Sequence, residues 1–384
     1  MNFDRLDQYL KQFVEHRNDL PGCDVIIQRG HRVLHRAQFG FSNLEKQLPV
    51  RGDELYCLYS CTKPITVVGA MRLVEQGLLD LDAPVSRYLP FFSEAYLQNG
   101  DTRKRPEHEI TVRHLFTMTA GFTYNMSTAP IKALFAQNTV GERISTISFA
   151  KAALASPLAF EPGDRYYYSI CLDLLGAVVE AVSDMPFGEY QKKNIFDPLG
   201  MSRTGFIGLL SDHEVPAPVY LYDTAKKEAH LHTAIYEFGL DPHFESGGAG
   251  LLSTVEDYAK FAATMAHSGL SADGYRLLRP ETIRQMTTEQ LTSLTKNPHF
   301  ECAAGPGYGY GLGVRTLIRH DCGQRSPLGE FGWDGAAGSY VMMDMTHDLS
   351  IFFATHLRGW HSGFGSIHAP IRDMTYDILG IETV

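Results

Sequence analysis

The sequence of 384 residues has a deficit of positive charge, and no basic stripe recurs along it. Lys and Arg total 34 against 44 Asp and Glu, which gives a formal net charge of −10. A polyanion would have to bind against this field, so we expect neither a nucleic-acid partner nor binding to an anionic membrane surface. Hydrophobic residues make up 44% and charged residues 20%, ordinary globular values that exclude a disordered, collagenous or coiled-coil protein.

Long hydrophobic runs are also missing. The most apolar stretch, residues 351–354, is cut off by His356 and Arg358, so the sequence predicts no membrane-spanning helix. The first 17 residues carry charges from Asp4 onward and no apolar block of secretory-signal length, which predicts mature sequence from the start. Without an export signal, the six cysteines are expected to be free thiols. These features together predict a cytoplasmic protein.

Several catalytic signatures are absent. The sequence contains no H-E-x-x-H, Walker or G-x-G-x-x-G pattern, and the missing G-x-S-x-G elbow argues against the α/β-hydrolase route to an esterase. His230 and His232 could lie on one side of a strand, but no cysteine or carboxylate completes a metal set at familiar spacing. We therefore expect no metal site and no organic cofactor.

Short β-type runs lie near both ends of the chain. Residues 24–28 and 32–36 flank a turn at Gly30, and residues 338–343 and 349–353 flank a polar turn, so each pair predicts a hairpin. The expected fold class is therefore α/β (α+β), with an antiparallel sheet built from both chain ends and flanked by helices.

Helical periodicity marks the N-terminus and the middle of the chain. Apolar residues recur at helical spacing over residues 3–14, 65–76, 112–118, 149–155, 172–183 and 371–379. No repeat, low-complexity tract or Ser/Gly linker separates independent domains. We predict a discontinuous α/β sheet domain from residues 1–88 and 205–384, a helical insert domain from residues 89–204, and an active site in the cleft between them.

The sharpest local feature is the hexapeptide YSCTKP at residues 59–64, which opens an apolar helix. Lys63 lies three residues on from Ser60, one turn away on the same helix face, so its amine can approach the hydroxyl. A lysine acts as a base only where its surroundings disfavour the charged form, as near a helix N-terminus or after desolvation. The same helix start points N–H groups outward, so the Ser60 amide could supply half of an oxyanion hole.

A structural reading of this hexapeptide stays open. Ser60 or Thr62 could simply cap the helix while Lys63 is a solvated side chain, since a lone S-x-x-K occurs by chance in many proteins. Cys61 is an alternative nucleophile, but it points to a different helix face from Lys63, and no histidine pairs with it in the sequence pattern.

Two further segments favour the catalytic reading. Residues 161–176 contain a Pro-Gly turn, an aromatic run and a helix, and residues 331–339 are a Gly-rich approach to the C-terminal hairpin. Together with Ser60-x-x-Lys63, these resemble the three motifs of the serine β-lactamase and penicillin-binding-protein superfamily, in the same order. Four more segments resemble the class C β-lactamase-related group: residues 73–85, 110–115, 247–254 and 308–313.

The resemblance implies a β-lactamase/DD-peptidase-like fold and a set of catalytic roles. Carried over by position, Ser60 is the acylated nucleophile, Lys63 its base partner, and Tyr168 the phenol that shuttles the proton. The Tyr-Ser-x-x-x-Asp spacing selects Tyr168 over its two tyrosine neighbours. The amide of Ala336 matches the position that completes the oxyanion hole, and Gly335 keeps the backbone open beside the serine.

The departures from the lactamase pattern concern substrate binding. Ile170 stands where motif two has an Asn that hydrogen-bonds the substrate amide, and Trp333-Asp334-Gly335 stands where motif three has Lys-Thr-Gly. A charge-assisted hydrogen bond contributes roughly 1.5–3 kcal/mol, so the missing cation should weaken penicillin binding by about tenfold or more. The pattern resembles the family VIII carboxylesterases, and Ile170 and Trp333 would then form an apolar wall. Strand alternation is expected to turn Asp334 away from Trp333 and Gly335.

The sequence therefore predicts a serine hydrolase that acts through an acyl-enzyme on small-molecule esters or amides, with carboxylic esters of short to medium acyl chains favoured. A β-lactamase or D-amino-acid peptidase (DD-carboxypeptidase) on the same fold is the nearest alternative. A non-catalytic binding or assembly protein that keeps the fold is an alternative of another class. Whether the protein forms a homo-oligomer stays open.

Overall fold

The computed structural model describes residues 1–16, 19–137, 141–211, 213–232, 241–292, 305–321 and 323–382. Its largest element is an eight-stranded antiparallel sheet in the order β11-β12-β13-β14-β15-β1-β2-β3. The strands are β1 (Gly22–Arg29), β2 (Arg32–Asn43), β3 (Leu48–Pro49), β11 (Tyr308–Tyr310), β12 (Arg315–Leu317), β13 (Phe331–Asp334), β14 (Tyr340–Asp344) and β15 (Leu349–Thr355). Because β1 pairs with β15, the sheet is built from both chain ends, as the sequence predicts.

Both predicted hairpins are confirmed. The β1–β2 pair turns at Gly30, whose φ of +58° lies in the left-handed region that glycine adopts without strain. The β14–β15 pair runs antiparallel from Tyr340 opposite Phe353 to Asp344 opposite Leu349. These hairpins place β13, which carries the third motif, beside the strands of the N-terminal region.

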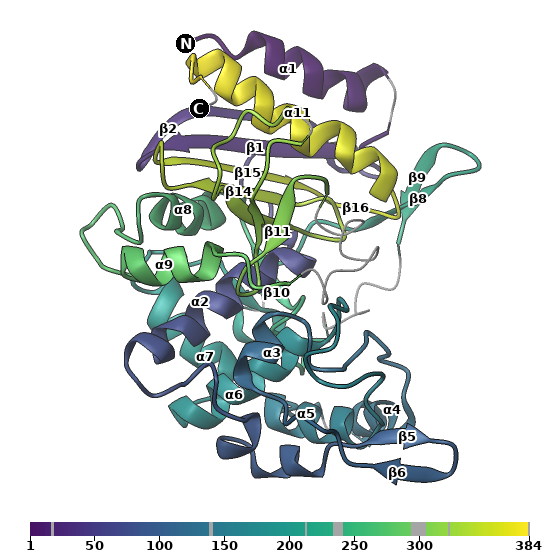
Figure 1. Ribbon diagram of the computed structural model, residues 1–384. Helices are drawn as coiled ribbons and strands as arrows, with labels where there is room; N and C mark the ends of the chain where they lie inside the picture. The colour runs from purple at the N-terminus through teal and green to yellow at the C-terminus, as the bar shows by residue number, and fades with distance from the viewer. Residues whose placement is uncertain are drawn as a thin grey trace.

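The large sheet is covered on both faces. Helices α1 (Asp4–Lys11) and α11 (His361–Leu379) lie together on one face, and α8 (Val255–Ala266) packs against the other (Figure 1). Alternate β1 side chains enter different cores: Val25 belongs to the cluster beneath α1 and α11, whereas Ile26 belongs to the larger cluster on the opposite side. Because β1 is buried on both faces, its sequence contains a continuous apolar run at residues 25–27 instead of alternating apolar and polar residues.

The middle of the chain is mostly helical. It contains α2 (Thr62–Glu75), α3 (Val112–Phe116), α4 (Ala129–Gln137), α5 (Thr146–Leu154), α6 (Cys171–Ser183) and α7 (Phe187–Gln191), followed later by α9 (Pro280–Thr287). Helix α6 packs against both α5 and α2, so α2 joins the helical part in the lower half of Figure 1 to the sheet. The helices expected from periodicity are confirmed, while the division at residues 88/89 and 204/205 stays a prediction.

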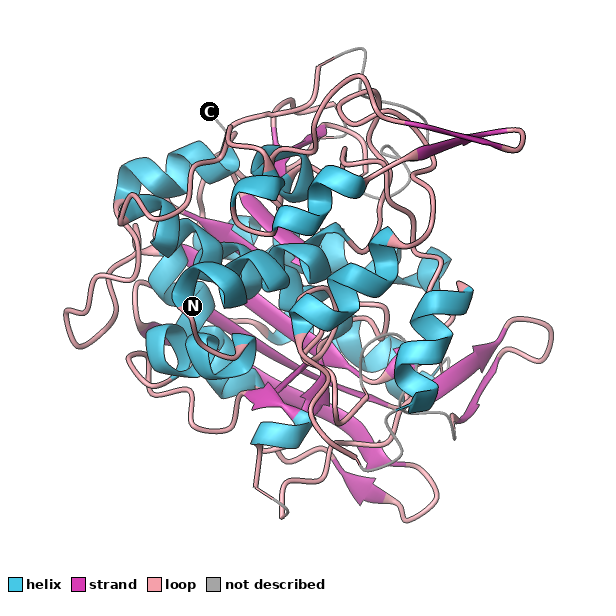
Figure 2. Cartoon of the chain, turned by 90° about the horizontal axis from the view of Figure 1, so that it is seen from below, coloured by secondary structure: helices cyan, strands magenta, loops and turns pink. Residues whose placement is uncertain are grey.

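Three smaller sheets complete the fold. They are β4-β10-β7, formed by Tyr56–Cys57, Leu251–Ser253 and Gly205–Phe206; β16-β8-β9, formed by Leu357–Arg358, Tyr220–Asp223 and Glu228–Leu231; and β5-β6, formed by Leu97–Asn99 and Thr102–Lys104. The β5–β6 and β8–β9 hairpins project from the body of the molecule (Figures 1 and 2). No helix in the described part of the chain is long and apolar enough to cross a membrane.

Candidate active site

The turn that carries Ser60 is held by the small β4-β10-β7 sheet. Ser60 sits in a single 3₁₀ turn, Tyr59–Cys61, that leads directly into α2. The N–H of Leu58 donates to Leu251 O at 3.0 Å, and the N–H of Leu251 donates to Thr62 Oγ1 at 3.1 Å. Tyr59 has a φ of +46°, a left-handed conformation that strains a non-glycine residue. The surrounding bonds therefore hold a strained backbone beside Ser60.

Lys63 lies in the first turn of α2 and is fully buried. Its amine has three neutral oxygen partners: Nζ lies 3.0 Å from Ser60 Oγ, 2.8 Å from Tyr124 Oη and 2.7 Å from the carbonyl oxygen of Gly248. No carboxylate in the described part of the chain lies within ion-pair distance of this amine. These contacts fix the amine beside the Ser60 hydroxyl.

The Gly248 carbonyl is fixed by a buried carboxylate. Asp173, near the start of α6, accepts from the Gly248 N–H at 3.0 Å and from the Ser246 hydroxyl. A Cβ atom at residue 248 would come within 2.6 Å of Asp173 Oδ2, so only glycine lets the backbone approach this closely. Burial raises the pKa of the Asp173 carboxyl, against the opposing effects of Ser246 and the Lys63 charge.

Tyr168 reaches Ser60 from the segment just before α6. Its hydroxyl donates to Ser60 Oγ at 2.7 Å and accepts from the indole N–H of Trp333 at 3.2 Å. The Trp333 and Tyr168 rings stack with centroids 5.7 Å apart, and Lys63 Nζ lies 4.7 Å from the Tyr168 centroid. Of the three consecutive tyrosines, Tyr168 is the one whose hydroxyl meets Ser60, whereas Tyr166 is buried against Tyr310.

The turn after β13 lies against the Ser60 turn. Gly335 donates its N–H to Ser339 O at 2.8 Å, and the Ser339 hydroxyl donates to Leu58 O at 3.0 Å. A Cβ atom on Gly335 would lie 2.3 Å from Leu58 O, so glycine is required for this approach. The Ala336 N–H takes no part in the hydrogen bonds recorded among the described residues of this turn, and Ala336 lines the same cavity as Ser60. An amide in this position can donate to an oxyanion.

Ser60 opens into a cavity of about 670 Å³. Its described lining contains Ser60, Tyr168, Gly305, Pro306, Tyr308, Arg315, Gln324, Trp333, Asp334, Gly335, Ala336, Phe364, Gly365, His368, Ala369, Arg372 and Asp373. This volume is in the range of small-molecule sites. Burial lowers the pKa of His368 in this lining, which favours its neutral form.

Two expectations about the lining require correction. Ile170, expected as part of an apolar wall, is 3% exposed in the core cluster and is absent from the cavity lining, because it ends the approach to α6 with its side chain among other core residues. Asp334, expected to face away, does pair with Arg315 of the neighbouring strand, yet it still lines the cavity. Strand β13 ends at Asp334, and the cavity extends around this end.

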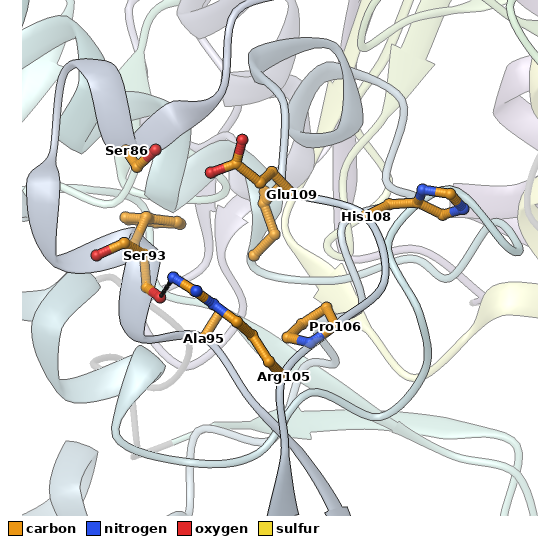
Figure 3. A pocket seen from close by; sticks show the side chains of 9 residues that line it. Ser86, Ser93, Ala95, Arg105, Pro106, His108 and Glu109 are labelled. Carbon is orange, nitrogen blue, oxygen red and sulfur yellow. Dashed lines mark hydrogen bonds between the residues drawn. The ribbon is translucent and has the colours of Figure 1, made fainter.

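A second hollow near the β5–β6 hairpin is too small for an ester. It measures about 30 Å³ and is lined by Ser86, Ser93, Arg105 and Glu109, among others (Figure 3). Arg105 donates to Ser93 O at 3.2 Å across it. This volume corresponds to about one water molecule, so the hollow does not compete with the Ser60 cavity as a substrate site.

The described residues support neither Cys61 as the nucleophile nor a metal site. Cys61 is fully buried, and burial raises the pKa of its thiol to about 12, so the reactive thiolate is disfavoured. No group of three or more potential metal ligands occurs in the described part of the chain. Cys23, Cys57 and Cys171 are also buried free thiols. The other two cysteines, Cys302 and Cys322, lie outside the described residues.

Two contributors to the site carry little signal in the sequence. Tyr124, whose hydroxyl lies on Lys63, comes from the loop between α3 and α4, where no periodicity or motif marks it. Its pKa is raised well above 10 by burial and by Tyr168, so its hydroxyl stays neutral. The Gly248 contribution is a backbone oxygen, and although residues 247–254 resemble the family, nothing in the sequence marks this carbonyl as a partner of Lys63.

A scan of family models matches residues 6–372 to the family described as Beta-lactamase. The chain belongs to the beta-lactamase family. Esterase EstB from Burkholderia gladioli is 28% identical over 393 residues, covering 97% of this chain and 94% of that protein. The named relatives of this beta-lactamase-family chain include esterases and acyltransferases.

Solved structures agree with this family and fold. EstCE1, described as a hydrolase with promiscuous acyltransferase activity, superposes with a TM-score of 0.79 at 27% identity and covers 97% of this chain and 98% of its own. Simvastatin synthase (LovD) from Aspergillus terreus has a TM-score of 0.81 at 22% identity, with 98% and 99% covered. At that identity the second match shows the fold alone. The beta-lactamase/DD-peptidase fold expected from the three motifs is confirmed.

Proposed function

We propose that this beta-lactamase-family protein is a serine carboxylesterase with Ser60 as its nucleophile. The observation that carries the proposal is the position of Ser60 Oγ, within 3.0 Å of Lys63 Nζ and 2.7 Å of Tyr168 Oη, at the wall of the large cavity. A hydroxyl in contact with two groups able to hold its proton is an activated nucleophile. A protein that only binds a ligand needs no such arrangement.

In the proposed reaction, Ser60 Oγ attacks the ester carbonyl carbon while its proton passes to the Lys63 and Tyr168 pair. The amides of Ser60 and Ala336 donate to the oxyanion that forms. When the tetrahedral intermediate collapses, the carbon–oxygen bond of the ester breaks and the alcohol leaves with that proton. Water then attacks the acyl-enzyme, the same pair takes its proton, and the carboxylic acid is released with Ser60 restored.

Esters are favoured over β-lactams and D-amino-acid peptides because of Trp333. The lactamase motif places a lysine at this position, whose charge meets the substrate carboxylate, whereas an indole carries no charge and here donates its N–H to Tyr168. The names of the relatives EstB and EstCE1 support hydrolysis of this kind. An alcohol could also replace water in the second step, and the acyltransferases among the relatives favour testing this.

The test compares initial rates on p-nitrophenyl butyrate and a chromogenic cephalosporin for the wild type and Ser60→Ala. We expect ester turnover that the substitution reduces by roughly 10⁴-fold or more, with little cephalosporin hydrolysis in either protein. Faster cephalosporin than ester turnover would favour a β-lactamase. Ester turnover retained in Ser60→Ala would exclude Ser60 as the nucleophile.

A further inference from the structure

Part of the cavity lining is charged, but its charges are paired with one another. Four described lining residues carry formal charges there, and they form two ion pairs: Arg315 with Asp334, and Arg372 with Asp373. In each pair the arginine is nearly buried, with 5% and 6% of the side chain exposed, whereas the carboxylates are 40% and 30% exposed. The negatively charged partners therefore face the open space more than the cations do.

Both terminal nitrogens of Arg315 donate to oxygen acceptors of the protein. One terminal nitrogen donates to Asp334 Oδ1 and the other to the Val341 carbonyl at 3.4 Å, while the guanidinium packs against the Tyr340 and Tyr308 rings. The pairing follows from strand register: Arg315 of β12 stands opposite Gly332, so Asp334 is its diagonal neighbour on the adjacent strand. Burial works to lower the pKa of Arg315, but Asp334 acting together with Tyr340, Tyr308 and Glu330 outweighs it and the pKa is raised.

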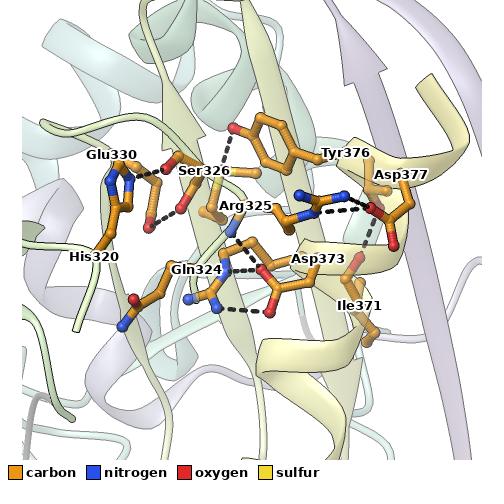
Figure 4. Close-up of polar contacts among 12 residues, drawn as sticks. His320, Gln324, Arg325, Ser326, Glu330, Ile371, Asp373, Tyr376 and Asp377 are labelled. Carbon is orange, nitrogen blue, oxygen red and sulfur yellow. Dashed lines mark hydrogen bonds and ion pairs between the residues drawn. The ribbon is translucent and has the colours of Figure 1, made fainter. Parts of the chain in front are cut away.

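The second ion pair, between Arg372 and Asp373, is also held by several hydrogen bonds. Arg372 donates from Nε and Nη2 to both oxygens of Asp373, at 2.8 and 2.9 Å, and from Nη1 to Tyr308 Oη at 2.7 Å. Asp373 also accepts from the Arg325 N–H at 3.0 Å, which ties α11 to the loop at residues 323–326 (Figure 4). Tyr308 in turn donates to the buried carboxyl of Glu330 at 2.6 Å. Both guanidinium groups are thus already bonded to oxygen acceptors of the protein.

We propose that this cavity selects uncharged esters and rejects those that carry a carboxylate, and that Asp334 is the main specificity-determining residue. The proposal rests on the proposed ester hydrolysis. An anionic substrate would meet the exposed edges of Asp334 and Asp373, and it would find the charge of each arginine already paired with a carboxylate. Asp334 lies between Trp333 and Gly335, whose contacts with Tyr168 and Leu58 fix its place beside the Ser60 turn.

The test uses two esters of equal chain length, p-nitrophenyl hexanoate and mono-p-nitrophenyl adipate, which differ by the terminal carboxylate. For the wild type we expect kcat/KM at least tenfold higher on the hexanoate. Asp334→Asn keeps the shape of the side chain and releases Arg315, so it should narrow that ratio by roughly tenfold, as expected for one charge-assisted hydrogen bond. Equal wild-type rates on the two esters would overturn the proposal.

Matched variants show whether the change in the kcat/KM ratio comes from the charge at residue 334 or from the net charge of the protein. Glu281→Gln makes the same change in net charge on the exposed face of α9 and should leave the ratio unchanged. If Asp334→Asn fails to fold because it leaves a buried cation unpaired, Asp373→Asn frees Arg372 and should narrow the ratio in the same direction. A folded Asp334→Asn protein with the wild-type ratio would contradict the role of Asp334.

A binding measurement keeps this inference apart from the proposed function. Calorimetric titration of Ser60→Ala with methyl hexanoate and with monomethyl adipate requires no turnover. We expect the neutral ester to bind at least tenfold more tightly, and the double variant Ser60→Ala with Asp334→Asn to reduce that difference. If the wild type hydrolyses neither ester but this preference is found, the proposed function fails while the inference stands; equal binding of both esters would refute the inference.

Discussion

The surroundings of Lys63 and the charged part of the cavity lining treat positive charge in opposite ways. At the Ser60 end, Lys63 is surrounded by neutral oxygens, and the buried Asp173 acts on it through the Gly248 backbone. In the charged part of the lining, Arg315 and Arg372 each contact a carboxylate directly. A lysine without a carboxylate partner can direct its amine to a reacting hydroxyl, whereas an arginine in an ion pair keeps its charge and its position. The first arrangement suits proton transfer and the second suits a fixed binding wall.

Replacing the cation at the Ser60 end should have the largest effect. Lys63→Met keeps the length of the side chain but removes the amine, so we expect ester kcat/KM to fall by roughly 10³-fold or more. Initial rates on p-nitrophenyl butyrate measure this, with Lys193→Met on the exposed surface as the control. A loss smaller than tenfold would mean that Tyr168 alone carries the proton. The difference between Lys63 and the paired arginines would then have no catalytic meaning.

Disturbing the close approach between the Ser60 turn and the turn after β13 should have the next largest effect. In Gly335→Ala the added carbon would lie 2.1 Å from Ser339 Oγ and 2.3 Å from Leu58 O, so the turns carrying Ser60 and Ala336 must separate. We expect kcat/KM to fall by about 100-fold, as for loss of an oxyanion donor. Gly176→Ala in α6, whose added carbon meets Phe187 at an ordinary 3.5 Å, is the control. Equal activities of the two variants would contradict the required close approach.

A smaller effect is expected when Lys63 loses one neutral partner. Tyr124→Phe keeps the ring but removes the hydroxyl that lies 2.8 Å from Nζ, and we expect kcat/KM to fall by roughly tenfold. Tyr275→Phe, on the loop before α9, serves as the matched control. The measurement is kcat and KM separately: a role in placing the amine lowers kcat, whereas an unchanged kcat with a raised KM would make Tyr124 a binding residue instead.

The pH dependence of ester hydrolysis must be separated from that of folding. Burial lowers the pKa of His114 and of His356 to about 4, from an ordinary value of 6.5. Between these values the unfolded chain takes up protons that the folded protein does not, so stability is intact above pH 6.5 and falls as the pH drops toward 4. These two histidines alone would lower the free energy of unfolding by roughly 2 kcal/mol between pH 6.5 and 5.5. Burial raises the pKa of the Asp24 carboxyl to about 7, so the folded protein binds this proton first, which opposes the loss by roughly 1 kcal/mol. We therefore expect a net loss of about 1 kcal/mol.

Urea unfolding at pH 7.5, 6.5 and 5.5 measures that loss, and constant stability across the range would contradict it. This loss of stability should have a smaller effect on activity than the Lys63, Gly335 and Tyr124 substitutions, because the protein remains mostly folded above pH 6. A rise in kcat/KM between pH 6.5 and 8.5 would then report deprotonation at the Ser60 end. A flat profile over the same interval would count against an amine base.

The sequence predicts the residues around Ser60 better than the charged part of the cavity lining, for physical reasons. Ser60 and Lys63 are linked by helical periodicity, which a sequence displays directly, and Tyr168 is marked by its spacing in a motif. The pairing of Arg315 with Asp334 depends instead on the register between β12 and β13, which no local pattern specifies. The position of Ile170 depends on how the segment before α6 packs, and alignment to a motif cannot supply that.

The pairing of β1 with β15 also fixes when during synthesis the cavity can form. Strand β1 and the Ser60 turn are synthesised well before β13 and α11, which contribute to the cavity lining, and before β15, which pairs with β1. Until then the central strand lacks its partner and exposes an apolar edge, a state that favours slow folding and aggregation. Expression with a co-translational chaperone, or at low temperature, should therefore raise the yield of folded protein more than it would for a chain of the same length with local strand pairing.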